Sequence, residues 1–249
     1  RALVGLLGLA AVLFAGLYAL WGELPEMTAQ EREVLGRIPR GIATLSTDVA
    51  DVKAAREVIL QYYVQYPTKV TLVWCATYVL MQAFAVPGTS VLSILGGAIF
   101  GVRKGFPLVA VTSTTGATCS YLLSYVFGRP LAQMLYKERV ARFQAETARH
   151  RDRMWNYMLF LRLTPLVPNT LINVASPIAG VPIGHFFFGT MLGQGMTNFM
   201  AVNAGSRLSE LNSLRDIADV RIVGFMAFLG LVALSPIFLK RGKAKEKRG

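Results

Sequence analysis

The sequence predicts an all-α integral membrane protein, in which transmembrane helices accompany two opposed re-entrant helical hairpins in an inverted repeat. Three observations support this prediction. The 249 residues are 53% hydrophobic and 16% charged, with a mean hydropathy of +0.45, which is more apolar than a soluble domain. Several segments have about the length needed to cross a bilayer. Two further apolar segments are interrupted by proline, and they resemble each other.

The first apolar segment, Ala2–Trp21, contains no charge. It has the roughly 20 residues of a membrane span and ends in tryptophan, which is typical of membrane interfaces. We therefore expect a retained transmembrane helix. A cleaved signal peptide is the alternative, although its apolar core is usually shorter, about 7–15 residues.

The polar segment over residues 22–69 carries apolar side chains at helical spacing, which predicts an amphipathic helix. These side chains are Val52, Ala55, Ile59, Tyr62, Tyr63 and Tyr66. Asp48 and Asp51 are placed to cap the start of this helix. Its tyrosine-rich face suits the membrane interface and the flank of a membrane domain equally well. We expect residues 1–69 to form one N-terminal region, with a transmembrane helix and this amphipathic interfacial segment.

The segment over residues 70–128 has two adjacent basic residues and no acidic residue, and it is too long for one span. Pro87-Gly88 interrupts it, because proline removes a backbone donor and glycine favours turns. We therefore predict a hairpin over residues 70–100 and a span over residues 106–127. Small residues in and near this span permit close helix contact; they are Gly116, Ala117, Ser120 and Ser124.

The most unusual stretch covers residues 160–189. It is apolar, yet it holds Arg162, Asn169 and Asn173, and four prolines interrupt it. These prolines are Pro165, Pro168, Pro177 and Pro182. In lipid, a broken backbone survives only inside protein or beside a wet cavity, and an intramembrane arginine marks a functional site by default. We predict a re-entrant hairpin with Arg162 on one arm and residues 165–169 at its tip; an interfacial helix whose arginine reaches the head groups is the alternative.

Basic residues gather in the segment 129–153 and in the tail 240–249. The positive-inside rule places both in the cytoplasm, where an anionic lipid surface is the expected partner. No basic patch is interleaved with aromatic residues, which argues against nucleic acid. We expect a solvated helix over 129–153 and further spans over 186–203 and 222–239. This topology requires both hairpins to return to the side from which they entered.

The two halves of the chain match at a nearly constant offset. The matching positions are Pro87-Gly88-Thr89 with Pro168-Asn169-Thr170, Gly101 with Gly180, and Gly116-x-Thr118 with Gly195-x-Thr197. Hairpins that enter from opposite faces form the inverted-repeat design of transporters; a chance match among glycine-rich segments is the alternative. We expect a membrane domain over residues 70–205, followed by a last transmembrane helix and a basic cytosolic tail over 206–249.

No pattern in the sequence predicts catalysis. The chain has no HExxH or GxSxG motif and no nucleotide-binding loop, and His185 has no plausible nucleophile nearby. Cys75 and Cys119 lie in apolar stretches without metal-ligand spacing, so we expect buried thiols. We therefore predict that the protein is not an enzyme, with no catalytic residue, no metal and no cofactor.

Several motifs together indicate a family. They are Phe84-x-x-Pro87-Gly88, Gly96-Gly97-x-x-Phe100-Gly101, Gly116-Ala117-Thr118-x-x-Tyr121, Phe127-Gly128-Arg129 and Phe160-x-Arg162-x-x-Pro165-x-x-Pro168-Asn169-x-x-x-Asn173. Over roughly residues 70–205 the chain resembles the DedA (VTT-domain, SNARE-associated Golgi) superfamily, and its eukaryotic endoplasmic-reticulum branch in particular. The resemblance implies two opposed re-entrant hairpins and energy-independent phospholipid scrambling between leaflets, in support of lipid mobilisation and autophagosome formation. It also implies the endoplasmic reticulum, with the Golgi or another endomembrane as the alternative.

The expected partners are phospholipids, and oligomeric state is left open. The candidate lipid pathway consists of Arg162, Pro165, Pro168, Asn169, Asn173, Pro87, Gly88 and Asn198. Arg162 would pair with phosphate, and the amide side chains, including Gln194, would supply neutral hydrogen bonds; contact between helices is the alternative for each amide. Proton-coupled bacterial relatives carry acidic residues in the first hairpin region, which this chain lacks, so downhill exchange fits better. An ion- or proton-coupled carrier of an anionic lipid or small solute and a non-transporting membrane scaffold are the alternative functions.

Overall fold

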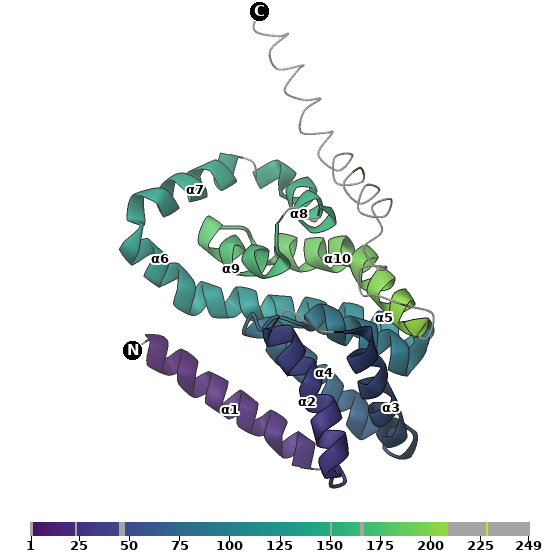
Figure 1. The fold of residues 1–249 in the computed structure, drawn as a ribbon. Coiled ribbons are helices and arrows are strands. Elements are labelled where there is room, and N and C mark those ends of the chain that lie inside the picture. The colour runs from purple at the N-terminus through teal and green to yellow at the C-terminus, as the bar shows by residue number, and fades with distance from the viewer. Residues whose placement is uncertain are drawn as a thin grey trace, which may run out of the picture. The chain divides into compact units, whose positions relative to one another are not determined.

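The computed structural model describes residues 2–22, 24–44, 48–149, 151–164, 167–208 and 228. Within these residues the secondary structure is helical and no strand occurs (Figure 1), which confirms the all-α prediction. The predicted last span (222–239) and the basic tail (240–249) lie outside the described residues, apart from Phe228. One helical stretch of the described chain, Thr89–Leu135, is long and apolar enough to cross a membrane.

The described helices follow one another with short connections. In order they are α1 (Ala2–Gly22), α2 (Ala29–Ala43), α3 (Val49–Gln65), α4 (Pro67–Ala83), α5 (Thr89–Leu123), a π-helical turn (Ser124–Gly128), α6 (Arg129–Leu135), α7 (Lys137–Arg149), a 3-10 turn (Arg151–Arg153), α8 (Met154–Leu163), α9 (Asn169–Ala179) and α10 (Ile183–Ser206). They form two compact units. Of the described residues, 2–119 and 198–208 belong to the first unit, and 120–197 and 228 belong to the second, so α5 and α10 each contribute to both.

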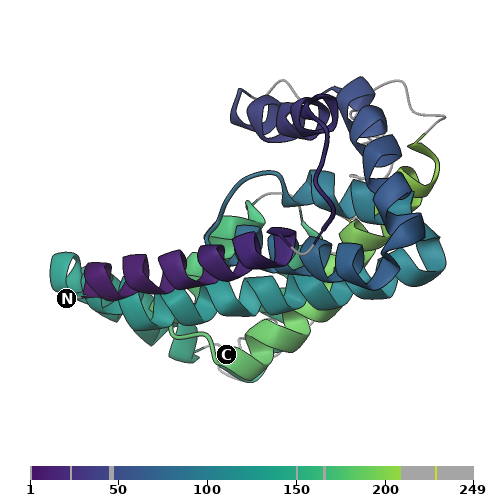
Figure 2. The ribbon, with the colours of Figure 1, turned by 90° about the horizontal axis from the view of Figure 1, so that it is seen from below.

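The first unit begins with α1, an uninterrupted helix (purple in Figure 2) that covers the predicted first span. The next helix, α2, is absent from the predicted elements. It starts with a capping box, in which the backbone N–H and the hydroxyl of Thr28 donate to the Glu31 carboxylate at 2.7 and 2.8 Å. These hydrogen bonds from Thr28 lower the pKa of Glu31, because they favour its charged form.

A helix, α3, forms where the spacing of apolar residues predicts one. The predicted capping role of Asp48 is wrong: the residue occupies the N-cap position, but its side chain makes no capping hydrogen bond, and Asp51 lies within the first turn, where it complements the helix dipole instead. Val52 and Ala55 are fully buried, and α3 contacts both α2 and α4. This packing favours the predicted location at the flank of the helical domain.

Helices α4 and α5 flank a turn over residues 84–88, at the break that Pro87-Gly88 predicts. The second arm of the predicted hairpin (70–100) and the predicted span (106–127) both belong to α5, which is kinked at Gly101. Trp74 of α4 packs against Tyr78 and Phe100, with ring centroids 5.3 and 5.4 Å apart. The hydroxyls of Tyr78 and Ser93 form a buried hydrogen bond of 2.9 Å between α4 and α5. Around these residues lies the hydrophobic core of the first unit, to which α2 and α3 also contribute.

Gly88 completes the turn between α4 and α5. Its φ is +107°, and a Cβ there would lie 2.3 Å from Cδ1 of Ile42 in α2. We expect Gly88→Ala to lower the free energy of unfolding by about 2 kcal/mol or more, because backbone strain and overlap add. Thermal unfolding of the purified protein in detergent measures this loss.

Two further variants separate these two causes. The cost of Gly88→Ala should be smaller in an Ile42→Ala background, which removes the overlap and keeps the strain. Gly36→Ala in α2 is the matched control, since a Cβ there meets no atom within 4 Å. An equal cost of Gly88→Ala in both backgrounds would contradict the role of Ile42.

Small residues bring helices into close contact, as predicted. A Cβ on Gly116 of α5 would lie 2.6 Å from Cβ of Gln82 in α4. A Cβ on Gly205 of α10 would lie only 1.8 Å from the carbonyl oxygen of Ile94 in α5, so these two helices touch through their backbones.

The free thiols of Cys75 and Cys119 are half-buried rather than buried, since other helices cover their sides of α4 and α5 only in part.

Both halves of the chain show the same local order of elements. A break between helices is followed by a short helix, a glycine with positive φ, and a long helix. Gly101 (φ +70°) divides α5 in this way, and Gly180 (φ +81°) ends α9 before α10. A positive φ is sterically unfavourable for residues that carry a Cβ. Gly101 and Gly180 are also the glycines that correspond to each other when the sequences of the two halves are compared.

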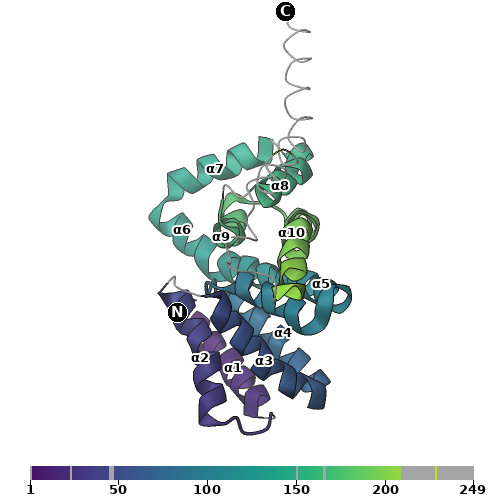
Figure 3. The ribbon, with the colours of Figure 1, turned by 45° about the vertical axis from the view of Figure 1, so that its right-hand side comes forward.

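In the second unit, helices α6 and α7 confirm the helical prediction for the basic segment over residues 129–153 (Figure 3). Most of their side chains are exposed. The Gln144 side chain of α7 donates to the carbonyl of Ile178 at 2.9 Å, and the Ser124 hydroxyl donates to the carbonyl of Val174 at 2.7 Å. Both bonds hold this basic segment and the turn before it against α9.

Candidate functional site

The helix break between α8 and α9 lies where the prolines predict it. Helix α8 ends at Leu163, and the N–H of Thr164 still donates to the carbonyl of Phe160 at 3.0 Å. Pro168 then occupies the N-cap position of α9 with an extended ψ of 133°. Proline has no N–H to continue a helix, so the chain starts a new helix at Asn169. Pro165 lies outside the described residues.

Arg162 lies in the last turn of α8 and is only 3% exposed. Its Nη1 donates to Oδ1 of Asn169 at 3.0 Å, and its Nη2 donates to Oδ1 of Asn173 at 2.7 Å. Asn169 and Asn173 are four residues apart, so they share one face of α9. Three of the predicted site residues therefore form one cluster (Figure 1 shows α8, α9 and α10).

The cluster holds a positive charge that no carboxylate among the described residues neutralises. Both hydrogen-bond partners of Arg162 are neutral amides, and its Nε has no partner within the described chain. The ring of Phe186 in α10 lies 5.1 Å from the guanidinium carbon, which adds a cation–π interaction. The arrangement is therefore suited to receive an anion.

Helix α10 approaches α8 through two glycines. A Cβ on Gly193 would lie 2.4 Å from Cβ of Arg162, and one on Gly189 would lie 2.7 Å from Cβ of Met158. This Gly-x-x-x-Gly spacing is a known signal for close helix packing in membranes. The spacing can be read from the sequence, but the predicted site does not include these two glycines.

Two polar side chains next to these glycines on α10 are buried without a partner. Thr190 Oγ1 and Gln194 Oε1 have no hydrogen-bond partner within the described chain, and both residues are at most 4% exposed. An unpaired buried polar atom costs about 1–3 kcal/mol, so both atoms are candidates to bind a polar group of a ligand. Gln194 was expected to supply hydrogen bonds, whereas Thr190 was not predicted.

The other predicted site residues belong to the first unit. Pro87 and Gly88 form the turn before α5, with Gly88 close to Ile42. Asn198 is buried, and its Nδ2 donates to the Ser113 hydroxyl at 2.8 Å. The sequence left two roles open for Asn198, and its amide makes the contact between helices.

Metal binding has no visible basis in this part of the chain. In the described ranges, no group of three or more His, Cys, Asp or Glu side chains is placed to hold a metal ion. The site therefore consists of a buried guanidinium, amides and hydroxyls. Such groups bind and orient anionic or zwitterionic groups through charge-assisted hydrogen bonds.

Comparison with known proteins shows the family to which the chain belongs. The VTT domain family matches residues 86–207. The chain is 38% identical, over 94% of its length and 78% of the other protein, to an uncharacterized membrane protein of Arabidopsis thaliana. It is 35% identical to Transmembrane protein 41B of Danio rerio, over 93% of this chain and 79% of the relative. The chain belongs to the VTT-domain family.

Another relative is also named as a transmembrane protein. The Transmembrane protein 41 homolog of Caenorhabditis elegans is 35% identical over 93% of this chain and 91% of its own length. No solved structure matches the chain. The resemblance to the eukaryotic branch of the VTT-domain superfamily is confirmed, and this VTT-domain protein is an integral membrane protein. The names of these relatives describe membrane proteins and mention no enzyme.

Proposed function

We propose that this protein is a phospholipid scramblase, which moves phospholipids between the two leaflets of a membrane without an energy source. The observation that carries the proposal is the buried Arg162. A charge of this kind is costly in a membrane interior unless a partner compensates it. Its neutral partners, Asn169 and Asn173, orient the guanidinium and leave its charge available. A lipid phosphate supplies the missing negative charge.

The broken helices provide a route for the head group. We infer that the turn at Pro87-Gly88 and the break between α8 and α9 are the tips of two re-entrant hairpins that enter from opposite faces. This inference is supported by the same local order of elements in both halves and by the inverted repeats of other transporters. The head group would cross along polar atoms of α8, α9 and α10 while its acyl chains stay in hydrocarbon.

Downhill exchange agrees with the lack of carboxylates in the first half of the membrane domain. No acidic residue occurs over residues 70–128, and proton-coupled transporters use chains of carboxylates and histidines. Scrambling of this kind equilibrates the leaflets wherever lipid is added to or removed from one side. We place this activity in the endoplasmic reticulum, in support of lipid mobilisation and autophagosome formation, as the family resemblance implies.

Reconstitution tests the proposal directly. The purified full chain is placed in liposomes with a fluorescent phospholipid in both leaflets, and a membrane-impermeant reductant bleaches the outer leaflet. We expect bleaching to continue into the inner-leaflet pool, at a rate that an imposed pH or sodium gradient does not change. Bleaching limited to the outer leaflet, as in empty liposomes, would exclude the function. A rate that requires a gradient would indicate a coupled carrier instead.

A further inference from the structure

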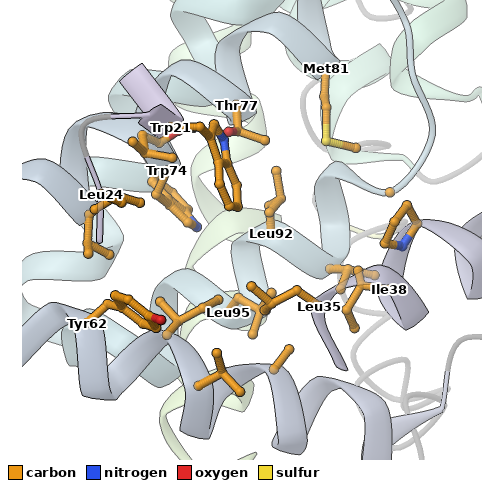
Figure 4. Close-up of a pocket in the computed structure, with 18 of the residues that line it drawn as sticks. Trp21, Leu24, Leu35, Ile38, Tyr62, Trp74, Thr77, Met81, Leu92 and Leu95 are labelled. Atoms are coloured by element: carbon orange, nitrogen blue, oxygen red, sulfur yellow. Dashed lines mark hydrogen bonds between the residues drawn. The ribbon is translucent and has the colours of Figure 1, made fainter. Parts of the chain in front are cut away.

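A second possible ligand site lies in the first unit. A cavity of about 320 Å³ lies between α2, α3, α4 and the start of α5, close to the end of α1, and it is partly open to the outside. Its walls are almost entirely apolar, and Figure 4 shows side chains such as Leu35, Ile38, Leu92 and Leu95 around it. Small-molecule sites typically have volumes of about 300–1,000 Å³ and mostly apolar walls, so the cavity has the size of a ligand pocket.

Among the buried side chains of the wall, one hydrogen-bond donor has no acceptor within the described chain. The Tyr62 hydroxyl donates to the Glu31 carboxylate at 3.0 Å, and the Thr77 hydroxyl donates to the Val73 carbonyl at 2.8 Å. In contrast, Trp74 is only 5% exposed, and its Nε1 has no acceptor within the described chain. The pocket therefore matches a long apolar group that carries one hydrogen-bond acceptor.

The position of the pocket indicates where such a group would come from. Trp21 lines the pocket and lies one residue before the end of α1, a helix with the length of a membrane span. Tryptophan at the end of a span lies at the membrane interface, which is also the depth of the ester groups of phospholipids. An apolar pocket at this depth is open to chains from the surrounding lipid.

We propose that this pocket binds one acyl chain of a membrane phospholipid, with an ester carbonyl that accepts a hydrogen bond from Nε1 of Trp74. An ester group accepts hydrogen bonds and donates none, so it matches Nε1 of Trp74, a donor that lacks an acceptor. A sterol hydroxyl would bring an additional donor into an apolar space, and a free fatty acid would bring a carboxylate near Glu31. Binding here involves no movement between leaflets, so the proposal does not depend on the scramblase activity.

Photocrosslinking in liposomes tests the pocket. The probe is a phosphatidylcholine with a diazirine in the middle of one acyl chain, and peptide mapping locates the adducts. We expect adducts on pocket residues such as Leu92, in addition to adducts on Val111, which is 65% exposed and reports lipid at the protein surface. Adducts on Val111 without adducts in the pocket would overturn the proposal.

A cavity-filling variant provides the matched comparison. Ala55→Phe places a ring in the pocket and should lower the ratio of pocket to Val111 adducts about tenfold. Val64→Phe adds the same ring on the same helix at an 80% exposed position and should leave the ratio unchanged. An equal ratio in both variants would overturn the proposal, as would displacement of the pocket adducts by unlabelled cholesterol but not by unlabelled phosphatidylcholine.

Trp74→Phe tests the hydrogen bond and keeps most of the ring. The wild type should label in the pocket about fivefold more with an ester-linked probe than with its ether-linked analogue. In Trp74→Phe this preference should vanish, and labelling of Val111 should not change. A preference that persists in Trp74→Phe, or is absent in the wild type, would exclude Trp74 as the donor. This measurement also holds if Ala55→Phe fails to fold.

Discussion

Arg162→Ala is expected to lower the rate of lipid scrambling about ten- to hundredfold. The substitution removes the charge that would bind the lipid phosphate, and a hydrogen bond to a charged group contributes about 1.5–3 kcal/mol. The amide oxygens of Asn169 and Asn173 also lose their donors. The fluorescent-lipid assay in liposomes measures the rate, and thermal unfolding in detergent measures whether the variant is folded.

Two other variants distinguish a specific role from a general effect of charge. Arg162→Lys keeps the charge but cannot reproduce two forked hydrogen bonds, so an intermediate rate is expected. Arg37→Ala removes an arginine of an exposed ion pair with Glu33, which contributes little to stability, and should scramble like the wild type. A folded Arg162→Ala protein with the wild-type rate would remove Arg162 from the lipid pathway.

Gly205→Ala is expected to produce the largest loss of stability among single methyl additions. The new Cβ would lie 1.8 Å from the carbonyl oxygen of Ile94, and backbone cannot move aside as a flexible side chain can. Overpacking usually costs about 1–3 kcal/mol, and we expect at least the upper end of this range. That corresponds to a fall of about 6–12 °C in the melting temperature, measured by thermal unfolding in detergent.

Gly195→Ala is the matched control on the same helix. A Cβ at Gly195 meets no atom within 4 Å, and alanine is favoured over glycine inside a helix by about 1 kcal/mol. We therefore expect an unchanged or slightly higher melting temperature. Equal melting temperatures for the two variants would show that α5 and α10 are not in backbone contact at Gly205.

The breaks between helices were predictable because they follow from local backbone chemistry. Pro168 lacks the donor that a continuous helix needs, and the chain starts α9 directly after it. Gly88 and Gly101 mark two further interruptions, and both have positive φ. Helix α2 was not predicted, although Thr28-x-x-Glu31 is a capping-box pattern; the segment after it contains Pro39 and Gly41, which lower helix propensity.

The partners of Arg162 were not predictable in the same way. From the sequence, Arg162, Asn169 and Asn173 were each assigned to a lipid head group. In the structure the two amide oxygens accept hydrogen bonds from the guanidinium, so the asparagines position the arginine first. Their spacing of four residues indicated a shared face of α9, but it did not indicate that Arg162 lies against that face.

Residue composition and the backbone limits of proline and glycine were sufficient to establish a helical membrane protein, the positions of its helix breaks and its family resemblance, because each depends on neighbours in the chain. Packing alone established that Arg162 meets Phe186 and Gly193, that Asn198 bonds to Ser113, and that Trp74 retains an unused donor beside an apolar cavity. These contacts join residues far apart in the chain, and the orientation of one helix against another is not encoded in the pattern of either helix.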